Sequence, residues 1–398
     1  MIDHKTVFPL ELNTMPGWAG SSFYFNRYMD PNNKNEIFSQ DAINYWQDVD
    51  LYIGGSEHAT GHLLYSRFWQ KFLFDKGVVP KEEFAQKLIN QGMITGTSAF
   101  VYRVEGENTL VLKNLIGDRV VQPLHVDVSL VNPSDELDLI KFKENLLYAD
   151  FKDAKFLLED GVYIVGREVE KMSKSKYNVI SPDSICEDYG ADSLRLYEMF
   201  LGPLEQSKPW NTAGITGVHS FLKKMWRLHH TGAEGAFNVT EEEATAESLK
   251  TLHKTIKKVE EDIENFSFNT SVSSFMICVN ELTFQKCTSR SILEPLSILI
   301  SPYAPHIAEE LWSKLGHTVS IATTAFPIYE GKYLVESSKE YPISFNGKMR
   351  FKMELPTDMS TADIELAVMA HEKTKEQLQG RTPKKVIIVP GKIVNVVG

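Results

Sequence analysis

The chain has few cysteines and no long apolar run, and these shortages exclude several classes of protein. Its 3 cysteines form no C-x-x-C pair, so neither a disulfide framework nor a structural zinc site is expected. The densest apolar stretch, residues 292–300, is interrupted by Glu294 and Pro295. It falls short of the roughly 18 residues that a membrane span needs. A reducing cytoplasm fits this pattern best.

The composition is that of a globular protein. Of the 398 residues, 42% are hydrophobic and 24% are charged, which excludes a disordered chain and a fibrous repeat. At roughly 150 residues per domain, this length predicts two to three domains. The 42 basic and 53 acidic residues give a net charge of −11. That charge argues against a nucleic-acid binder, but it does not decide what a local basic patch does. The first residues, Met1 to Lys5, open no signal peptide.

Changes in pattern along the chain divide it into five segments and predict a multi-domain fold of the α/β and α classes. Residues 1–92 are expected to form a partial Rossmann-like nucleotide-binding unit, and residues 93–168 a β-rich insertion. Residues 169–230 carry a lysine-rich loop and the helices after it. Residues 231–325 are an acidic linker followed by a helical bundle, and residues 326–398 a small ββαββ domain.

The clearest helical signal lies in the fourth segment. Its first apolar stripe has the spacing 3-4-3-4-3 that one helix face requires, at Leu249, Leu252, Ile256, Val259, Ile263 and Phe266. Similar stripes follow over residues 272–282 and 307–315, so an antiparallel bundle is expected. In the last segment, Asn346-Gly347 predicts a hairpin turn, and Ser360 the start of a helix that ends near Gly380.

The string Lys171-Met-Ser-Lys-Ser175 is the most specific motif in the sequence. Two lysines and two hydroxyls in five positions can surround a polyphosphate, and lysine suits this role as a compact, mobile charge. A lysine that reaches a leaving pyrophosphate stabilises the transition state more than the ground state. The alternative is a solvated basic loop, but the complete string, followed by Lys176 and Asn178, favours the phosphate role. A helix is expected to begin near Ser181, with Pro182 at its first position.

A possible nucleotide site precedes this loop in the chain. A strand over residues 49–55 ends at Gly54 and Gly55, and a helical run over residues 62–73 follows. A strand, a glycine break and a helix start form a natural place for a nucleotide, although an ordinary βα turn has the same pattern. Glu57 would accept hydrogen bonds from both ribose hydroxyls, and its alternative role is a first-turn carboxylate on the helix dipole.

Two further groups of residues carry chemistry. His58 and His62 have metal-ligand spacing, but no further histidine or cysteine stands nearby. Packing or substrate contact is therefore the main interpretation and a metal the minor one. Residues 18–25 form a compact aromatic stretch, for which burial in a core is the default. The functional alternative is the wall of an apolar side-chain pocket in which Tyr24 and Ser21 hold an amino group.

On these residues the chain resembles the carboxy-terminal half of a class I aminoacyl-tRNA synthetase, and more narrowly the leucyl-tRNA synthetase family. The K-M-S-K-S string at residues 171–175 and the helix motif at residues 190–195 are shared with valyl and isoleucyl enzymes. The leucyl assignment rests on four further stretches, at residues 13–22, 50–58, 197–211 and 384–395. The likeness covers nearly the whole chain and is weakest over residues 98–159, where the family carries a variable insertion.

The resemblance implies a role for each motif. Lys174 and Lys171 would act in catalysis by contacting the ATP phosphates, in a loop shaped by Met172, Ser173 and Ser175. The residues that bind the adenosine part of ATP would be Gly54, Gly55 and Glu57. The leucine pocket would be lined by Trp18, Ser21, Tyr24, Tyr52, His58 and His62. The basic last domain would touch the tRNA elbow through Lys384, Lys385 and Lys392, while the helical bundle packs on the tRNA body.

The resemblance also implies partners and one departure. ATP with Mg²⁺, leucine and tRNA(Leu) would be the substrates. The protein would be a cytoplasmic monomer that binds no metal ion of its own and does not associate with a membrane. The family's first half, with its H-x-G-H signature and editing domain, has no counterpart in this sequence. The stretch His58-Ala-Thr-Gly-His62 has one residue too many for that signature and follows the ribose-binding strand. Without a separate first half as a partner, the chain is expected to be inactive.

Three alternatives stay open at this point. The first is a non-catalytic tRNA-binding or regulatory protein built from the same parts. The second is a valyl- or isoleucyl-type fragment. The third is an unrelated nucleotidyl-transfer enzyme that uses the lysine string alone and binds no tRNA.

Overall fold

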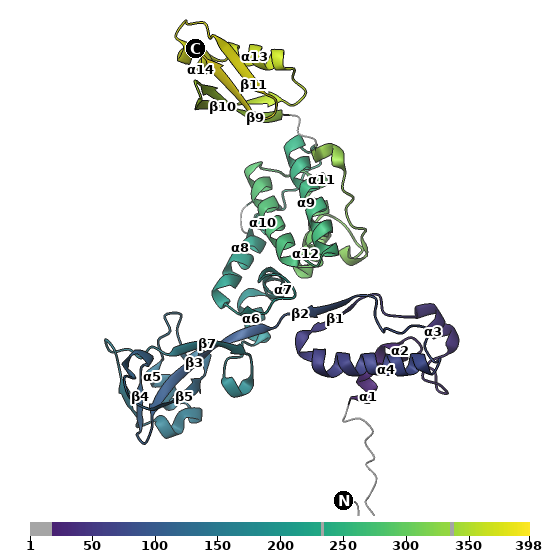
Figure 1. Ribbon diagram of the computed structural model, residues 1–398, viewed down its shortest axis with the longest axis vertical. Coiled ribbons are helices and arrows are strands. Elements are labelled where there is room, and N and C mark those ends of the chain that lie inside the picture. Colours follow the sequence, from purple (N-terminus) through teal and green to yellow (C-terminus); the bar gives the residue numbers. More distant parts are fainter. Residues whose placement is uncertain (1–17, 232–234, 335–337) are drawn as a thin grey trace, which may run out of the picture.

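The computed structural model describes residues 18–231, 235–334 and 338–398. Four units follow one another in an elongated molecule (Figure 1). An N-terminal α/β unit and a β-rich unit lie side by side at one end, a helical bundle forms the middle, and a small α/β domain forms the other end. Residues 13–17, the first part of the sequence motif at residues 13–22, lie outside the described residues. No described helix combines the length and the apolar character that crossing a membrane requires.

The N-terminal unit is built on a short parallel sheet. Strands β1 (Tyr52–Gly55) and β2 (Leu88–Gln91) pair in parallel, and among the described residues they are the whole of this sheet. The helices are α1 (Ala19–Ser22), α2 (Tyr24–Tyr28), α3 (Gln40–Trp46) and α4 (Leu64–Asp75). Between β1 and α4 the chain makes a 3-10 turn (Ser56–His58) and a π-helical turn (Ala59–Leu63). The helical run predicted from residue 62 therefore begins with a π turn, and the α-helix starts at Leu64.

Helix α4 has its apolar stripe on the outside. Leu64, Phe68 and Phe72 are spaced four residues apart and are 63%, 63% and 44% exposed. The buried positions of the same helix include Ser66 and Gln70. Gln70 is held there because its side chain accepts from Asn26 Nδ2 and donates to the carbonyl of Lys81. An outward apolar stripe over a parallel sheet is unusual, because parallel sheets are normally covered on both faces.

The β-rich unit is organised by one long strand. Strand β3 (Ile94–Val104) pairs with β4 (Thr109–Val111), β5 (Val121–Val126), β7 (Gly166–Lys171) and β8 (Lys208–Pro209), while β6 (Lys155–Leu157) pairs with β4. Side chains alternate along a strand, so Ala99 and Val101 join one hydrophobic core and Phe100 and Tyr102 another on the opposite face. The sheet thus reaches beyond residues 93–168 and includes β7, which leads directly into residues 171–175.

The helical bundle begins earlier in the chain than the sequence suggested. Its helices are α6 (Pro182–Tyr189), α7 (Ala191–Phe200), α8 (Thr212–Leu228), α9 (Ala246–Glu264), α10 (Phe268–Phe284), α11 (Arg290–Ile300) and α12 (Pro305–Lys314). One hydrophobic core runs from Ile185 to Ile321 and crosses the boundary predicted between residues 230 and 231. The expected stripe on α9 is confirmed, because Leu252, Ile256 and Val259 are buried in this core.

The last domain has two helices where one was expected. Strands β9 (Ser338–Phe345), β10 (Lys348–Pro356), β11 (Lys385–Val389) and β12 (Ile393–Val397) form a sheet in the order β10-β9-β12-β11. The predicted hairpin turn at Asn346-Gly347 is present, and both residues have positive φ. The predicted single helix is divided at His371 into α13 (Thr361–Ala370) and α14 (Glu372–Leu378). The order is therefore ββααββ.

Candidate active site

The lysine motif forms a structured loop between β7 and α6. We use the name lysine loop for residues 171–178. Lys174 opens a 3-10 turn that ends at Lys176, and Tyr177 has the left-handed φ of 51° that reverses the chain. Lys171 and Lys174 are exposed, and within the described part of the chain neither amine has a side-chain partner. Both charges are therefore available to an anionic ligand.

Asn178 holds the lysine loop closed. Its side chain is 1% exposed. Its Oδ1 accepts from the backbone N–H of Ser173 at 2.9 Å, and its Nδ2 donates to Ser98 Oγ at 2.9 Å and to the carbonyl of Lys171 at 3.3 Å. A buried amide is stable only when such partners are present. Asn178 therefore fixes the first and the middle residue of the five-residue motif and ties them to β3.

Glu170, the residue before the motif, binds the loop from its other side. Its carboxylate accepts from Lys176 Nζ at 2.5 Å and lies 2.9 Å from His125 Nε2 on β5. Hydrogen bonds from Lys176, Ser98 and His125 lower the pKa of Glu170 to about 2. The sequence reasoning identified neither Glu170 nor His125, because these contacts join residues 45 apart in the chain.

The glycine-ended strand presents a small, open site. Gly54 has free space where a side chain would stand. The Glu57 carboxylate folds back over Gly55, so a Cβ on Gly55 would lie 2.2 Å from Glu57 Oε2. Glu57 itself is exposed. Among the described residues no hydrogen bond or ion pair joins Glu57 to Lys174, so the predicted pairing of these two residues around one nucleotide stays a prediction.

Three of the predicted pocket residues are brought together. Tyr24 and Tyr52 share a hydrogen bond of 2.9 Å between their hydroxyls, and Tyr52 Oη lies 2.6 Å from His62 Nε2. Burial, with a smaller contribution from nearby His58, lowers the pKa of His62. Burial and the Tyr24 hydroxyl raise the pKa of Tyr52 well above its usual value. Its lowered pKa favours the neutral form of the His62 imidazole, which is hydrogen-bonded to Tyr52.

The other predicted pocket residues lie around this cluster with different surroundings. Trp18 packs edge-on to Tyr65, with a ring-centroid distance of 6.2 Å, and its ring closely approaches Gly61. The Ser21 hydroxyl donates to the carbonyl of Trp18, and both Ser21 and His58 are exposed. The structure therefore groups Tyr24, Tyr52 and His62 directly, and the remaining three stand at the edge of the group.

A residue that the sequence reasoning missed shapes the segment beside Tyr24. The Arg27 guanidinium donates to five backbone carbonyls, those of Asp30, Pro31, Asn33, Glu36 and Ile37. It thereby folds residues 30–37 around itself. A cavity of about 560 Å³ lies between this segment and Tyr24, lined also by Gly20 and Phe23. No local sequence signal marks such an arginine, because its partners are backbone atoms.

The three lysines expected to contact tRNA are all exposed on the last domain. Lys384 precedes β11, Lys385 is its first residue, and Lys392 is the last residue of the turn before β12. Their role stays a prediction. Among the described residues, no group of three or more His, Cys, Asp and Glu side chains is arranged to hold a metal ion.

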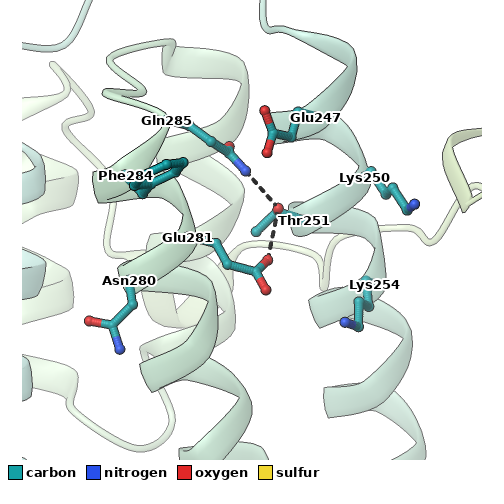
Figure 2. Close-up of a pocket in the computed structure, with 8 residues that line it drawn as sticks. All are labelled: Glu247, Lys250, Thr251, Lys254, Asn280, Glu281, Phe284 and Gln285. Atoms are coloured by element: carbon teal, nitrogen blue, oxygen red, sulfur yellow. Dashed lines mark hydrogen bonds between the residues drawn. The ribbon is translucent and has the colours of Figure 1, made fainter. Parts of the chain in front are cut away.

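A separate groove in the bundle contains three hydrogen-bonded side chains. Figure 2 shows Thr251 of α9 between Glu281 of α10 and Gln285, the residue that follows this helix. Thr251 Oγ1 donates to Glu281 at 3.0 Å and accepts from Gln285 Nε2 at 3.1 Å. The groove, of about 530 Å³, therefore contains a network that joins two helices.

Two segments of the chain match models of known protein families. Residues 155–208 match the family model described as tRNA synthetases class I (I, L, M and V), and residues 246–366 match the anticodon-binding domain of tRNA ligase. The first match contains the lysine loop, and the second runs from α9 into the last domain. The chain therefore belongs with the class I aminoacyl-tRNA synthetases.

Curated relatives narrow the class to one family. The chain is 70% identical over 396 residues to the leucine–tRNA ligase of Christiangramia forsetii, covering 100% of this chain and 41% of that protein. It is 66% identical over 398 residues to that of Flavobacterium psychrophilum, with the same coverage of both chains. The chain belongs to the leucine–tRNA ligase family, and it spans about two-fifths of the length of these relatives.

A solved structure agrees with this assignment. An Agrobacterium radiobacter K84 agnB2 LeuRS, crystallised in a ternary complex with tRNA and LeuAMS, has a TM-score of 0.57 and 27% identity to the chain. The match covers 95% of this chain and 42% of that one. The multi-domain α/β and α fold predicted from the sequence is confirmed.

Proposed function

We propose that this chain supplies the lysine loop, the leucine-pocket residues and the tRNA-contacting domains of a leucine–tRNA ligase. In this proposal a leucine carboxylate oxygen attacks the α-phosphorus of Mg²⁺-bound ATP, forming leucyl-adenylate and releasing pyrophosphate. A terminal hydroxyl of tRNA(Leu) then attacks the leucyl carbonyl, and AMP leaves. The observation that carries the proposal is the closed lysine loop, in which Lys171 and Lys174 are exposed and have no carboxylate partner among the residues that the structure describes.

The lysines act by electrostatics. Negative charge moves onto the pyrophosphate as its bond to the α-phosphorus breaks, and an ammonium that meets this charge lowers the barrier. Removing one such contact typically costs on the order of 2.7–4 kcal/mol, or about 10²–10³ in rate. Tyr24, Tyr52 and His62 would line the leucine side-chain pocket, and Gly54, Gly55 and Glu57 would bind the adenosine. The exposed Lys384, Lys385 and Lys392 would contact the tRNA.

The outward stripe of α4 supports a further part of the proposal. Leu64, Phe68 and Phe72 are exposed beside a sheet of two parallel strands, and a parallel sheet is stable when both its faces are covered. We propose that a further α/β segment adds strands beside β1 and packs on this stripe, which would complete the ATP site. The binding assay uses the part of the C. forsetii enzyme that this chain does not match. In this assay Phe68→Glu should abolish association. Phe284→Glu, at an exposed phenylalanine of α10, is the control. Equal binding by both variants would contradict this part.

The catalytic proposal is tested in a chimaeric enzyme in which this chain replaces the matching part of the C. forsetii leucine–tRNA ligase. Lys174→Ala should lower leucine-dependent ATP–pyrophosphate exchange about 10²–10³-fold, with little change in leucine binding. An equal loss of both would contradict the phosphate role. The 398-residue chain alone should show no exchange. A rate of on the order of 1 per second or more, typical of enzymes, would refute that expectation.

The alternatives are separated by the chimaera and by tRNA binding. A non-catalytic tRNA-binding protein would bind tRNA in a gel shift at defined salt, yet the chimaera would not activate leucine. An unrelated nucleotidyl transferase would not shift tRNA at all. The relatives are leucine–tRNA ligases, which favours leucine over valine or isoleucine as the amino acid. The same proposal includes a cytoplasmic location and a monomeric state. Size-exclusion chromatography tests the monomeric state.

A further inference from the structure

The β-rich insertion contacts the lysine loop at several points. His125 of β5 lies 2.9 Å from the Glu170 carboxylate, and the backbone N–H of Val128 donates to the carbonyl of Tyr177 at 3.0 Å. Strand β7, which carries Glu170, is paired along its length with β3. The loop is thus attached to the insertion both before and after its lysines.

Two sets of side-chain hydrogen bonds, one centred on Glu170 and one on Asn178, hold the loop beside these contacts. Glu170 binds Lys176 and His125, and it lies close enough to Ser98 for that hydroxyl to help lower its pKa. Ser98 Oγ in turn accepts from Asn178, whose Oδ1 accepts from the Ser173 N–H. Ser98 and Asn178 are 0% and 1% exposed, so the middle of this network is shielded from water. Networks of this kind hold one geometry because each buried group needs its partner.

The network also divides the lysines of the loop into two kinds. Lys176 is neutralised by Glu170 at 2.5 Å, whereas Lys171 and Lys174 have no carboxylate partner among the described residues. A lysine paired in this way is a poor phosphate ligand, because the carboxylate would have to be left unpaired. The two free lysines are then the ones that meet an anion.

We propose that Glu170 is a positioning residue, which clamps the lysine loop to the β-rich insertion through Lys176 and His125 and leaves Lys171 and Lys174 free for the triphosphate. The proposal rests on the proposed function and gives the insertion a role in it. Lys176 then serves to position the loop and does not bind phosphate, although it is part of the same basic cluster.

The clamp is tested first in the chain itself, without any activity. Hydrogen exchange of the Ser173 amide reports loop opening, because that N–H is bound to Asn178. Glu170→Gln and Lys176→Met should each speed its exchange about fivefold, a factor that corresponds to about 1 kcal/mol. The double variant should add little to either single change, because both remove one contact. Glu168→Gln is the matched control, since Glu168 is an exposed carboxylate two residues earlier on β7.

Unchanged exchange in both single variants, or an equal effect in the control, overturns the clamp. If a charge change at Glu170 or Lys176 unfolds the strand, His125→Gln still tests the clamp, because it leaves the loop's own residues intact. This variant should also speed exchange of the Ser173 amide. In the chimaeric enzyme, Glu170→Gln should lower the rate of adenylate formation about fivefold with an unchanged KM for leucine. If exchange responds as expected but neither Glu170→Gln nor Lys174→Ala alters activation, the clamp stands and the proposed function fails.

Discussion

Replacing Gly96 with alanine should release the lysine loop without touching it. Gly96 lies on β3 opposite Glu170. A Cβ at this position would stand 2.6 Å from the carbonyl oxygen of Asn178 and 3.0 Å from its Nδ2. Real side chains do not approach backbone atoms so closely, and Asn178 would have to move. Because Gly96 has no positive φ, backbone strain plays no part, and the effect should be purely steric.

The magnitude follows from the contacts that would be lost. Forcing an extra methyl into a packed site typically costs about 1–3 kcal/mol. Displacing Asn178 also breaks its hydrogen bonds of 2.9 Å to Ser173 and Ser98, each worth about 1 kcal/mol net. If part of the strain relaxes through loop movement, the free energy that favours the docked loop over the open loop falls by about 2–4 kcal/mol. That corresponds to roughly 30- to 900-fold faster exchange of the Ser173 amide.

The assay is hydrogen exchange at residue resolution, with an alanine substitution of opposite expected sign as control. Gly217 lies in α8, is exposed, and has free space at its Cβ position. Gly217→Ala should therefore stabilise the helix by about 0.5–1 kcal/mol and leave the loop unchanged. A change of less than about threefold at Ser173 in the Gly96→Ala variant would refute the steric reasoning.

Three further changes have defined outcomes. Acidification should destabilise the bundle, because burial lowers the pKa of His229 to about 4, against about 6.5 when unfolded. This contribution is complete above about pH 6.5 and should fall by about 3 kcal/mol near pH 4. Urea unfolding at several pH values measures it, and an equal slope in His229→Gln would contradict it. Asp192 accepts from two backbone N–H groups at the start of α12, so Asp192→Ala should cost about 1–2 kcal/mol in thermal unfolding, and an unchanged melting temperature would exclude this capping role. Thr251→Val removes the hydroxyl between Glu281 and Gln285 and should lower the urea midpoint by the equivalent of about 1 kcal/mol. A stabilised variant would show that the network is not favourable.

Elements with a strong local signal were predictable from the sequence. The stripe of α9 was correctly read because its apolar residues recur at helical spacing. The start of α6 was also read correctly, since Ser181 and Pro182 take the N-cap and first-turn positions. In such segments the local preference and the tertiary packing agree.

Features set by long-range contacts were not predictable. No glycine or proline marks the break between α13 and α14. The His371 ring stacks on Phe351 of β10 at 4.8 Å, and its Nδ1 accepts from the N–H of Lys373 to start the second helix. Likewise, α8 packs into the same core as α9, so one domain crosses the boundary that was expected between residues 230 and 231.

The candidate site also contains some residues that the sequence identified and others that only the structure reveals. The lysine motif was chosen from residue types at short spacing, whereas Tyr24, Tyr52 and His62 were assigned to one pocket by the family resemblance. The structure brings the latter three into contact. Glu170 is an ordinary carboxylate in the sequence, and its importance depends on a histidine from another strand. No pattern in one sequence reveals such a pair without knowledge of the strand register.

The shared strand β3 limits how far a shorter version of this protein can be engineered. Its first half pairs with β7 from Thr95 to Phe100, and its second half pairs with β5 from Ala99 to Val104. Excising residues 105–165 and joining the cut ends would keep the β3–β7 pairing that supports the lysine loop, but it would remove His125, which lies beside Glu170. Removal of the complete stretch 93–168 would take away the strand against which that loop is built. A minimal synthetase designed from this family would therefore have to retain β3 and replace the lost histidine.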